Sequence, residues 1–216
     1  MNRNLLIVGA GIYGVVASEI AADMGRFGKI DFIDDSRKTT PNGIEVIGTT
    51  REIGELAIEY GNIIVAIGAP EVRLSLLGRI KEETPYRIVS LISPKAHVSP
   101  SAQIMPGCIV EPMAVIHTGC VISTGCIISA GAVVNHASMC CDGVHVDCNA
   151  TVSGMALVPA GTKIKSGEVY DSKSADASDL FFKSEKEKAP SNAEKDARPH
   201  PPVAIDGQTY NFDDVM

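Results

Sequence analysis

Aliphatic residues recur every six positions through the middle of this chain. Twelve of the fourteen positions in the series are Ile or Val, and its members are Ile92, Val98, Ile104, Val110, Ile116, Ile122, Ile128, Val134, Cys140, Val146, Val152, Val158, Ile164 and Tyr170. A helix repeats every 3.6 residues and a strand every two, so neither explains this spacing. A period of six predicts a parallel β-helix, in which three hexapeptide units close one triangular coil of about eighteen residues.

A second column, of small residues, supports this prediction. Small side chains follow most of the aliphatic positions four residues later, namely Ala96, Ala102, Cys108, Ala114, Cys120, Cys126, Ala132, Ser138, Ala150 and Ala156. Glycine often stands just before this column, at Gly107, Gly119, Gly125, Gly131, Gly143, Gly161 and Gly167. Glycine tolerates the positive φ that a tight corner demands. Residues 98–169 would then form four coils, each stable only because its neighbours cover its aliphatic residues.

Length and charge limit what the chain can be. Its 216 residues have room for two small domains, and its net charge of −7 argues against nucleic acid or an anionic membrane as a partner. No apolar run approaches the roughly 20 residues of a membrane-spanning helix. The first apolar run, Leu5–Val8, is too short for the core of a signal peptide. We therefore expect a cytoplasmic protein.

The six cysteines do not predict a metal site. Three of them belong to the small column and a fourth, Cys140, takes an aliphatic position, so these four are expected to be small buried side chains. The remaining two, Cys141 and Cys148, do not form a CxxC pair. We expect no bound metal.

Residues 1–91 predict a Rossmann-like α/β domain. The strand Leu5–Val8 leads into Gly9, Gly11 and Gly14, which form a GxGxxG motif before a helix from Val15 to Met24. In this context the glycines permit a tight turn, and the helix N-terminus offers unpaired N–H groups to a phosphate. The same kind of turn also occurs without any ligand, so a purely structural role remains open.

The rest of this domain follows the same alternation of strands and helices. The strand Ile30–Ile33 ends in Asp34 and Asp35, at the distance where carboxylates often hold ribose hydroxyls. A strand over residues 63–67 ends at Gly68, a helix spans residues 70–83, and a last strand covers residues 87–91. The domain has room for only one nucleotide half of a full dinucleotide fold, so NAD is not the expected ligand.

Two histidines stand out on the predicted β-helix, residues 92–170. His136 lies two residues after the core position Val134, on the outer surface of a coil, and His145 follows nine residues later. An exposed histidine on a β-helix often has no role. A histidine whose pKa lies near 6.5 can accept a proton at neutral pH, however, which suits a general base.

These features together resemble the bacterial sugar acetyltransferases of the PglD and NeuD type, over residues 4 to about 165. The matching segments are the glycine loop, residues 32–35, residues 66–68 followed by 71–73, residues 93–96 and 99–102, and Asn135-His136 with His145. That family joins a small nucleotide-sugar-binding α/β domain to a left-handed β-helix of hexapeptide repeats. The resemblance implies a homotrimer, with active sites in grooves between adjacent β-helices.

The resemblance also implies an activity and a set of site residues. The activity is transfer of an acetyl group from acetyl-CoA to an amine or hydroxyl of a nucleotide-linked sugar, expected to be UDP-linked, for surface glycan synthesis. His136 is implied as the general base, and His145 and Gly154 as residues of the acetyl-CoA groove. The implied nucleotide-sugar pocket consists of Gly9, Gly11, Tyr13, Gly14, Asp34, Asp35, Arg37, Gly68 and Arg73.

Three departures from the family pattern keep a second function open. Ala137 stands where the family has an acidic residue after the catalytic histidine, Tyr13 replaces a histidine in the glycine loop, and the array stops near Tyr170, about two coils early. Without the carboxylate, nothing obvious orients the imidazole. The alternative is a non-catalytic trimeric module that binds a nucleotide sugar or a partner protein and has a degenerate acetyl-CoA site.

Residues 171–216 predict a polar linker that ends in a hairpin. Asp206-Gly207 lies between alternating apolar residues, which is a strong hairpin signal. A single hairpin is only marginally stable, so we expect it to dock on the end of the β-helix, on a neighbouring subunit or on a partner.

Overall fold

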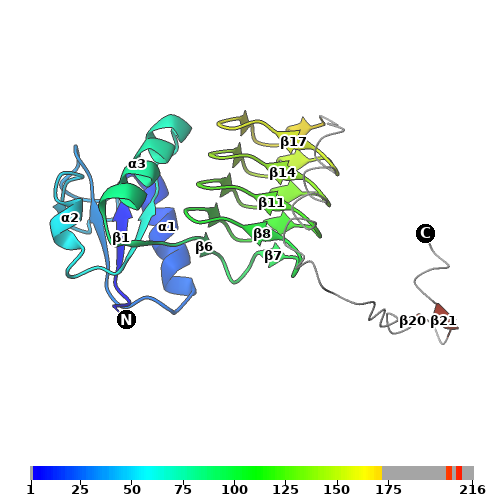
Figure 1. Ribbon diagram of the computed structural model, residues 1–216, viewed down its shortest axis with the longest axis horizontal. Coiled ribbons are helices and arrows are strands. Elements are labelled where there is room, and N and C mark those ends of the chain that lie inside the picture. The colour runs from blue at the N-terminus through cyan, green and yellow to red at the C-terminus, as the bar shows by residue number, and fades with distance from the viewer. Residues whose placement is uncertain (1, 172–202, 206–207, 211–216) are drawn as a thin grey trace, which may run out of the picture. The chain divides into compact units, whose positions relative to one another are not determined.

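The computed structural model describes residues 2–171, 203–205 and 208–210. The chain divides into two compact units, Met1–Phe182 and Lys183–Met216. The first unit begins with an α/β domain and continues as a β-helix, whose stacked coils are seen from the side in Figure 1. No helix in the described ranges is long and apolar enough to cross a membrane.

The α/β domain contains a five-stranded parallel sheet in the order β3-β2-β1-β4-β5. Its strands are β1 (Leu5–Val8), β2 (Ile30–Ile33), β3 (Val46–Gly48), β4 (Asn62–Val65) and β5 (Arg87–Ile88), and its helices are α1 (Ile12–Asp23), α2 (Ile53–Leu56) and α3 (Pro70–Glu83). All four residues of β1 are buried at the centre of the sheet, which explains their continuous apolar run. The strand order reverses between β1 and β4, which makes the carboxyl ends of these strands a topological switch point.

Two elements of this domain were not expected from the sequence. The strand β3 lies at the sheet edge and pairs with β2 across a register irregularity, while α2 is a single turn of four residues. Both are too short to show a hydrophobic period. The helix α1 also begins three residues earlier than expected, at Ile12, directly after Gly11 as its N-cap.

The second part of this unit is a parallel β-helix, as the period of six predicted, and it is left-handed, as the family resemblance implied. Its fourteen described strands form three sheets, which we name after their first members. The β6 sheet contains β6 (Leu91–Ile92), β9 (Ile109–Val110), β12 (Ile127–Ile128), β15 (His145–Val146) and β18 (Lys163–Ile164). The β7 sheet contains β7 (His97–Val98), β10 (Val115–Ile116), β13 (Val133–Val134), β16 (Thr151–Val152) and β19 (Val169–Tyr170). The β8 sheet contains β8 (Gln103–Ile104), β11 (Val121–Ile122), β14 (Met139–Cys140) and β17 (Leu157–Val158).

Strand pairing confirms the length of the coil. Ile116 pairs with Val134 and Val134 with Val152, so each residue meets its partner one coil of eighteen residues later. The aliphatic and small columns together form one buried interior cluster, which includes Cys108, Cys120, Cys126 and Cys140. The expectation that these cysteines are buried is therefore confirmed.

The corners of the coils all use the left-handed backbone region. Every sixth residue from 107 to 167 has a positive φ: seven are glycines, and four are Met113, Ala137, Asn149 and Met155. Glycine adopts this conformation without strain, whereas a residue with a Cβ is disfavoured there. The four exceptions therefore mark places where side chains are kept at a conformational cost.

The expected strand over residues 87–91 divides between the two folds. Arg87–Ile88 forms β5 of the α/β sheet, while Leu91 pairs with Ile109 as part of the β-helix. Leu91 lies eighteen residues before Ile109, so it already follows the coil register. The change of fold occurs within residues 89–90.

One corner of the β-helix packs against α3. This corner, which we call the α3 corner, joins the β8 sheet to the β6 sheet and consists of Gly107, Gly125, Gly143 and Gly161. A Cβ atom at Gly107 or Gly125 would come within 2.8–3.0 Å of Leu77, and one at Gly143 within 2.9 Å of Leu74. At these three positions glycine is therefore favoured twice, by the positive φ and by the close approach of leucine side chains from α3.

The second unit contains a two-stranded antiparallel sheet. The strand β20 (Val203–Ile205) pairs with β21 (Gln208–Tyr210), and Ile205 faces Gln208 across the two intervening residues. This is the segment where the sequence indicated a hairpin. The expected linker and the docking of the hairpin lie outside the described residues.

Candidate active site

A cavity of about 680 Å³ opens at the carboxyl edge of the α/β sheet, at the switch point between β1 and β4. We call it the carboxyl-edge cavity. Its lining is drawn from the segments that follow β1, β2, β3 and β4 and from one side of α3: Val8, Gly9, Asp34, Asp35, Ser36, Thr50, Ile67, Glu71, Val72, Ser75, Leu76 and Arg79. Ligands of open α/β sheets commonly bind at such a position, which makes this cavity a candidate binding site.

The three glycines of the GxGxxG motif have different reasons to be glycine. Gly9 has a φ of 108°, and a Cβ there would lie 2.8 Å from the carbonyl oxygen of Ala66. A Cβ at Gly14 would collide with the carbonyl oxygen of Gly9, so this glycine lets α1 pack closely on the loop. Gly11 has an ordinary φ of −78° and open space around its Cβ position. The local fold therefore explains Gly9 and Gly14, and Gly11 is compatible with the approach of a ligand.

The two aspartates of this edge hold its loops in place. The carboxylate of Asp34 accepts hydrogen bonds from the backbone N–H groups of Ala10, Ser36 and Arg37 and from the Ser36 hydroxyl, at 2.8–3.0 Å. Partial burial alone would raise the pKa of Asp34, but these donors lower it to about 2. Asp35 accepts bonds from the N–H and hydroxyl of Thr50. Both carboxylates are therefore held in place before any ligand arrives, and that of Asp34 is ionised.

Six of the residues implied for the nucleotide-sugar pocket do not line this cavity, among them Tyr13, Arg37, Gly68 and Arg73. Arg37 is exposed, and the carbonyl of Gly68 accepts a hydrogen bond from Arg73. Tyr13 extends from α1 toward the β-helix, where burial and the nearby Glu111 carboxylate raise its pKa well above the usual range. Gly11 and Gly14 also lie outside the lining, although they shape the loop that contains Gly9.

Arg73 is the strongest link between α3 and the β-helix. Its side chain is fully buried, and its guanidinium donates to the carbonyl oxygens of Gly125 and Gly143 at 2.7 and 2.8 Å. It also donates to the carbonyl oxygens of Ile67 and Gly68 at 2.6 and 2.9 Å. With four carbonyl partners, this group joins two domains and has little capacity left for a ligand.

Sequence reasoning missed part of the cavity wall on α3. Glu71, Ser75 and Arg79 are spaced four residues apart, and that spacing puts them on one face of the helix. Leu74 and Leu77 lie on the face toward the β-helix. A helical wheel of residues 70–83 would have separated these two faces.

His136 lies at a different corner of the β-helix, between β13 and β14. This corner, which we call the His136 corner, contains the positive-φ positions Gly119, Ala137 and Met155. The imidazole of His136 is exposed and lies against Gly154, one coil later, where a Cβ would be 2.8 Å from both Nε2 and Cε1 of the ring. Gly154 therefore makes room for the ring, and its own φ does not require glycine.

The backbone around His136 is fixed without a carboxylate at position 137. The N–H of His136 donates to the side-chain oxygen of Asn135, and its carbonyl oxygen accepts the N–H of Met155. Ala137 holds a φ of 52° and donates its N–H to the carbonyl oxygen of Thr118. The backbone of His136 is thus held by hydrogen bonds, and its ring packs on Gly154, with no acidic residue at position 137.

His145 lies in β15 of the β6 sheet and has a different environment. Its Nε2 atom is 3.1 Å from the hydroxyl of Ser129 and 3.9 Å from Asp147, which itself pairs with Lys163. Burial and the Lys163 ammonium lower the pKa of His145 to about 4. The ring is therefore neutral at pH 7 and a weak base, so it suits hydrogen bonding better than proton abstraction.

These two histidines face different sides of the same coil. The α/β domain contacts the β6 sheet, because Leu91 and Ile109 share one apolar cluster with Ala17 and Ile20 of α1, and it contacts the α3 corner. In a three-sided coil the His136 corner is opposite the β6 sheet. Within one chain, His136 therefore lies away from both His145 and the carboxyl-edge cavity.

No group of His, Cys, Asp or Glu within the described ranges is arranged to hold a metal ion.

Comparison with known proteins agrees with this architecture. Residues 4–80 match the family model of the PglD N-terminal domain. A search of curated proteins finds no match to the chain. Among solved structures, the acetyltransferase domain of PglB from Neisseria gonorrhoeae FA1090, in complex with acetyl coenzyme A, is 29% identical with a TM-score of 0.69. The match covers 80% of this chain and 93% of that domain.

A second solved structure shares the fold at lower identity. A variant of perosamine N-acetyltransferase from Caulobacter crescentus, in complex with CoA and GDP-perosamine, is 24% identical with a TM-score of 0.57. That match covers 79% of this chain and 89% of the other. The resemblance to the PglD/NeuD-type hexapeptide-repeat sugar acetyltransferases is therefore confirmed.

Proposed function

We propose that this protein is an acetyl-CoA-dependent acetyltransferase that acts on a sugar, with His136 as its general base. The observation that carries the proposal is the exposed imidazole of His136, which Gly154 accommodates on the next coil. The 29% identical PglB domain with bound acetyl coenzyme A supports the donor and the reaction class. Because this chain covers 93% of that domain, the early end of its array is no argument against a donor site.

The reaction is acyl transfer from a thioester. The nitrogen (or oxygen) of the acceptor attacks the carbonyl carbon of acetyl-CoA, a new bond to that carbon forms, and the carbon–sulfur bond breaks. His136 takes the proton that the acceptor loses, and the coenzyme A thiolate is protonated in turn. General-base help of this kind contributes about 10²–10⁴-fold to the rate. The neutral His145 is the better candidate for a hydrogen bond to the donor, together with the backbone near Gly154.

We further propose that the acceptor is a nucleotide-linked sugar held in the carboxyl-edge cavity. The switch-point position, the ordered Asp34 and Asp35 and the open space at Gly11 support this assignment. The C. crescentus enzyme was solved with GDP-perosamine, which is a nucleotide sugar. A UDP-linked amino sugar destined for a surface glycan is our specific proposal for this chain.

The active site in this proposal is built by two copies of the chain. His136 points away from the α/β domain of its own chain, and His145 and Gly154 lie on different sides of one coil. All three can serve one acetyl-CoA and one sugar only if a groove forms between adjacent β-helices. A homotrimer, in which each copy offers one corner to the next, meets this requirement.

Titration calorimetry with acetyl-CoA and, separately, with UDP- and GDP-linked amino sugars tests the proposal, followed by an assay of thiol release. We expect binding of both classes and acetyl transfer that depends on His136. Binding of a nucleotide sugar without binding of acetyl-CoA would overturn the enzyme assignment in favour of a non-catalytic nucleotide-sugar-binding module, for which the missing carboxylate at Ala137 is the supporting observation.

A further inference from the structure

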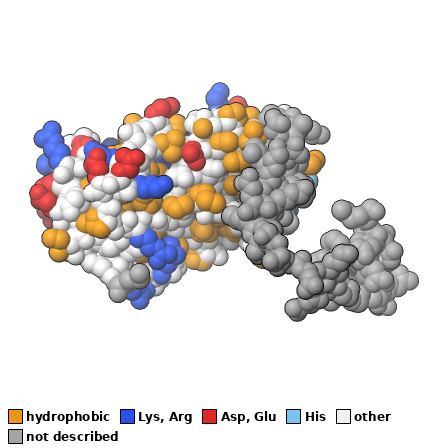
Figure 2. Space-filling model, in the orientation of Figure 1, with side chains coloured by type: hydrophobic (Ala, Val, Ile, Leu, Met, Phe, Trp, Pro, Cys, Tyr) orange, Lys and Arg blue, Asp and Glu red, His pale blue; other side chains and the backbone are white. Residues whose placement is uncertain are grey.

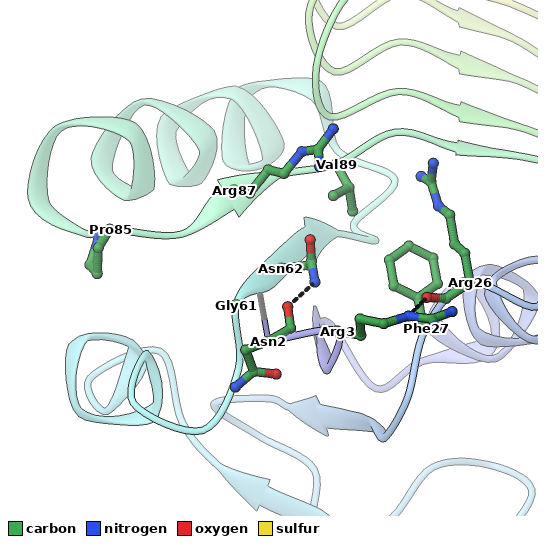
Figure 3. A pocket seen from close by; sticks show the side chains of 9 residues that line it. All are labelled: Asn2, Arg3, Arg26, Phe27, Gly61, Asn62, Pro85, Arg87 and Val89. Atoms are coloured by element: carbon green, nitrogen blue, oxygen red, sulfur yellow. Dashed lines mark hydrogen bonds between the residues drawn. The ribbon is translucent and has the colours of Figure 1, made fainter.

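A second cavity, of about 390 Å³, lies at the opposite, amino edge of the α/β sheet. We call it the amino-edge cavity (Figure 3). Three of its lining residues are arginines from segments far apart in the sequence: Arg3 before β1, Arg26 before β2, and Arg87 at the start of β5. Phe27 and Asn62 also line the cavity. The proposed nucleotide-sugar site does not use this edge.

The charge of this cavity is unbalanced. None of its lining residues is Asp or Glu, and none of the three arginines forms a salt bridge with a described residue. Figure 2 shows Lys and Arg side chains gathered on the lower part of one face, without acidic side chains between them. The chain as a whole has a net charge of −7. A cavity lined by three arginines and no acidic residue is therefore unusual for this chain.

Two of the arginines are already held in place. Arg3 donates from Nε to the carbonyl oxygen of Arg26 at 2.7 Å, and Arg26 donates to the carbonyl oxygen of Ser90 at 2.9 Å. The Arg26 guanidinium also lies over the ring of Phe27, 4.9 Å from its centre. These contacts reduce the side-chain entropy that a ligand would otherwise have to remove.

Arg87 is the arginine that is free to bind. Its side chain is exposed, and it has no hydrogen-bond partner within the described ranges. Figure 3 shows its guanidinium reaching the same side of the cavity as that of Arg26. Desolvation and the nearby charge of Arg87 lower the pKa of Arg26, so the two cations are close enough to repel each other. An anion between them would attract both guanidinium groups and so offset their mutual repulsion.

We propose that the amino-edge cavity is a binding site for a small phosphorylated molecule, whose phosphate is held between Arg26 and Arg87. The planar guanidinium fork matches phosphate oxygens in pairs, and bonds of this charged kind are about twice as strong as neutral ones. The cavity has the size of a small-molecule site, which favours a compact phosphate ester or pyrophosphate over a macromolecule. This site is separate from the one that holds the sugar substrate.

The test is a titration of the full-length protein with inorganic pyrophosphate. We expect saturable binding of one pyrophosphate per chain, weakened at least about tenfold in Arg87→Gln and more in Arg87→Glu. Lys81 of α3 is exposed and lies outside the cavity lining, so Lys81→Gln and Lys81→Glu are the matched controls and should bind as the wild type does. Thermal unfolding of each variant shows whether its fold is retained.

A third variant separates this site from the proposed sugar site. Ser75→Trp fills the carboxyl-edge cavity, so it should leave pyrophosphate binding unchanged. The proposal is overturned by an absence of saturable binding, by wild-type affinity in Arg87→Glu, or by loss of binding in Ser75→Trp. None of these outcomes depends on acetyl transfer, so the proposal stands or falls independently of the proposed enzyme activity.

Discussion

Two corners of the same β-helix use one backbone conformation for different purposes. The α3 corner is glycine at all four of its positions, and α3 side chains lie directly against three of them, Gly107, Gly125 and Gly143. The His136 corner keeps a positive φ at Gly119, Ala137 and Met155, so two of these three residues carry side chains in a strained conformation. The α3 corner packs against the α/β domain without backbone strain. The His136 corner places side chains at strained positions, at some cost in stability.

The two corners show how a repetitive fold can separate stability from chemistry. The coil itself needs only a positive φ at each corner, and glycine is the unstrained answer. A residue other than glycine at such a corner places a side chain on the surface in a strained conformation. Strained backbone positions often occur near functional sites. We therefore expect substitutions at the His136 corner to affect catalysis. We expect substitutions at the α3 corner to lower the free energy of unfolding.

The largest expected effect is on catalysis at the His136 corner. His136→Ala should lower acetyl transfer by about 10²–10⁴-fold, because it removes the base that takes the acceptor's proton. The side chain is exposed, so the thermal midpoint and acetyl-CoA affinity should change little. A steady-state assay of thiol release checks the rate, and His97→Gln, at another exposed histidine, is the control. Unchanged turnover would remove His136 from the mechanism.

The next largest effect should be on stability at the α3 corner. Arg73→Leu leaves the buried carbonyl oxygens of Gly125 and Gly143 without their donor, and each such loss costs about 1–3 kcal/mol. We expect a loss of about 3 kcal/mol or more in the free energy of unfolding, measured by urea denaturation at fixed protein concentration. Arg79→Leu, on the exposed part of the same helix, should cost less than about 1 kcal/mol. Equal losses would contradict the joining role of Arg73.

A single methyl group at the α3 corner should also be costly. In Gly143→Ala the new Cβ adopts an unfavourable φ of 71° and lies 2.9 Å from Leu74. A left-handed conformation costs a residue with a Cβ about 1–2 kcal/mol, and displacing Leu74 adds to that. We expect a loss of about 2 kcal/mol in urea denaturation. A stable Gly143→Ala protein would show that α3 does not need this close approach.

The same substitution at the His136 corner should affect the rate instead. Gly154 does not have a positive φ, so Gly154→Ala leaves the backbone unstrained, but its methyl group would meet the His136 ring at 2.8 Å. Displacing the imidazole should lower kcat about tenfold with little change in the thermal midpoint. If kcat is unchanged while stability falls, the contact between Gly154 and His136 is structural only.

The smallest effect is expected from relieving strain. Ala137→Gly replaces a residue whose φ is 52° by one that adopts this conformation freely, so stability should rise by up to about 1 kcal/mol. Gly119 already stands at the equivalent position one coil earlier, so the geometry accepts glycine. A clear loss of stability in urea denaturation would mean that the two corners do not differ in strain.

The sequence predicted most of the framework because the framework repeats. The period of six, the buried small column and the glycine corners each appear many times, so single exceptions such as Cys140 did not hide the pattern. The helix over residues 70–83 also agrees with its prediction. Elements without repetition were missed, as β3 and α2 show, because a strand of three residues and one helical turn contain no period.

The site was harder to predict because its residues meet through packing. Arg73 follows a family motif in sequence, yet its guanidinium is directed toward carbonyls from residues 125 and 143, which no local pattern could reveal. The low pKa of His145 likewise depends on burial and on Lys163 one coil later. Gly154 was identified only through family resemblance, while its physical reason is the His136 ring on the previous coil.

Complementation between two inactive variants tests whether two copies of the chain build one active site. His136→Ala lacks the base, and Ser75→Trp fills the carboxyl-edge cavity, so each variant alone should be inactive. Co-expressed chains form mixed oligomers, whose composition native mass spectrometry can verify. If the site is built by two copies, some grooves pair an intact His136 with an intact cavity, and acetyl transfer reappears. If mixed oligomers form and remain inactive, each site lies within one chain, and the proposal of an active site shared between copies is wrong.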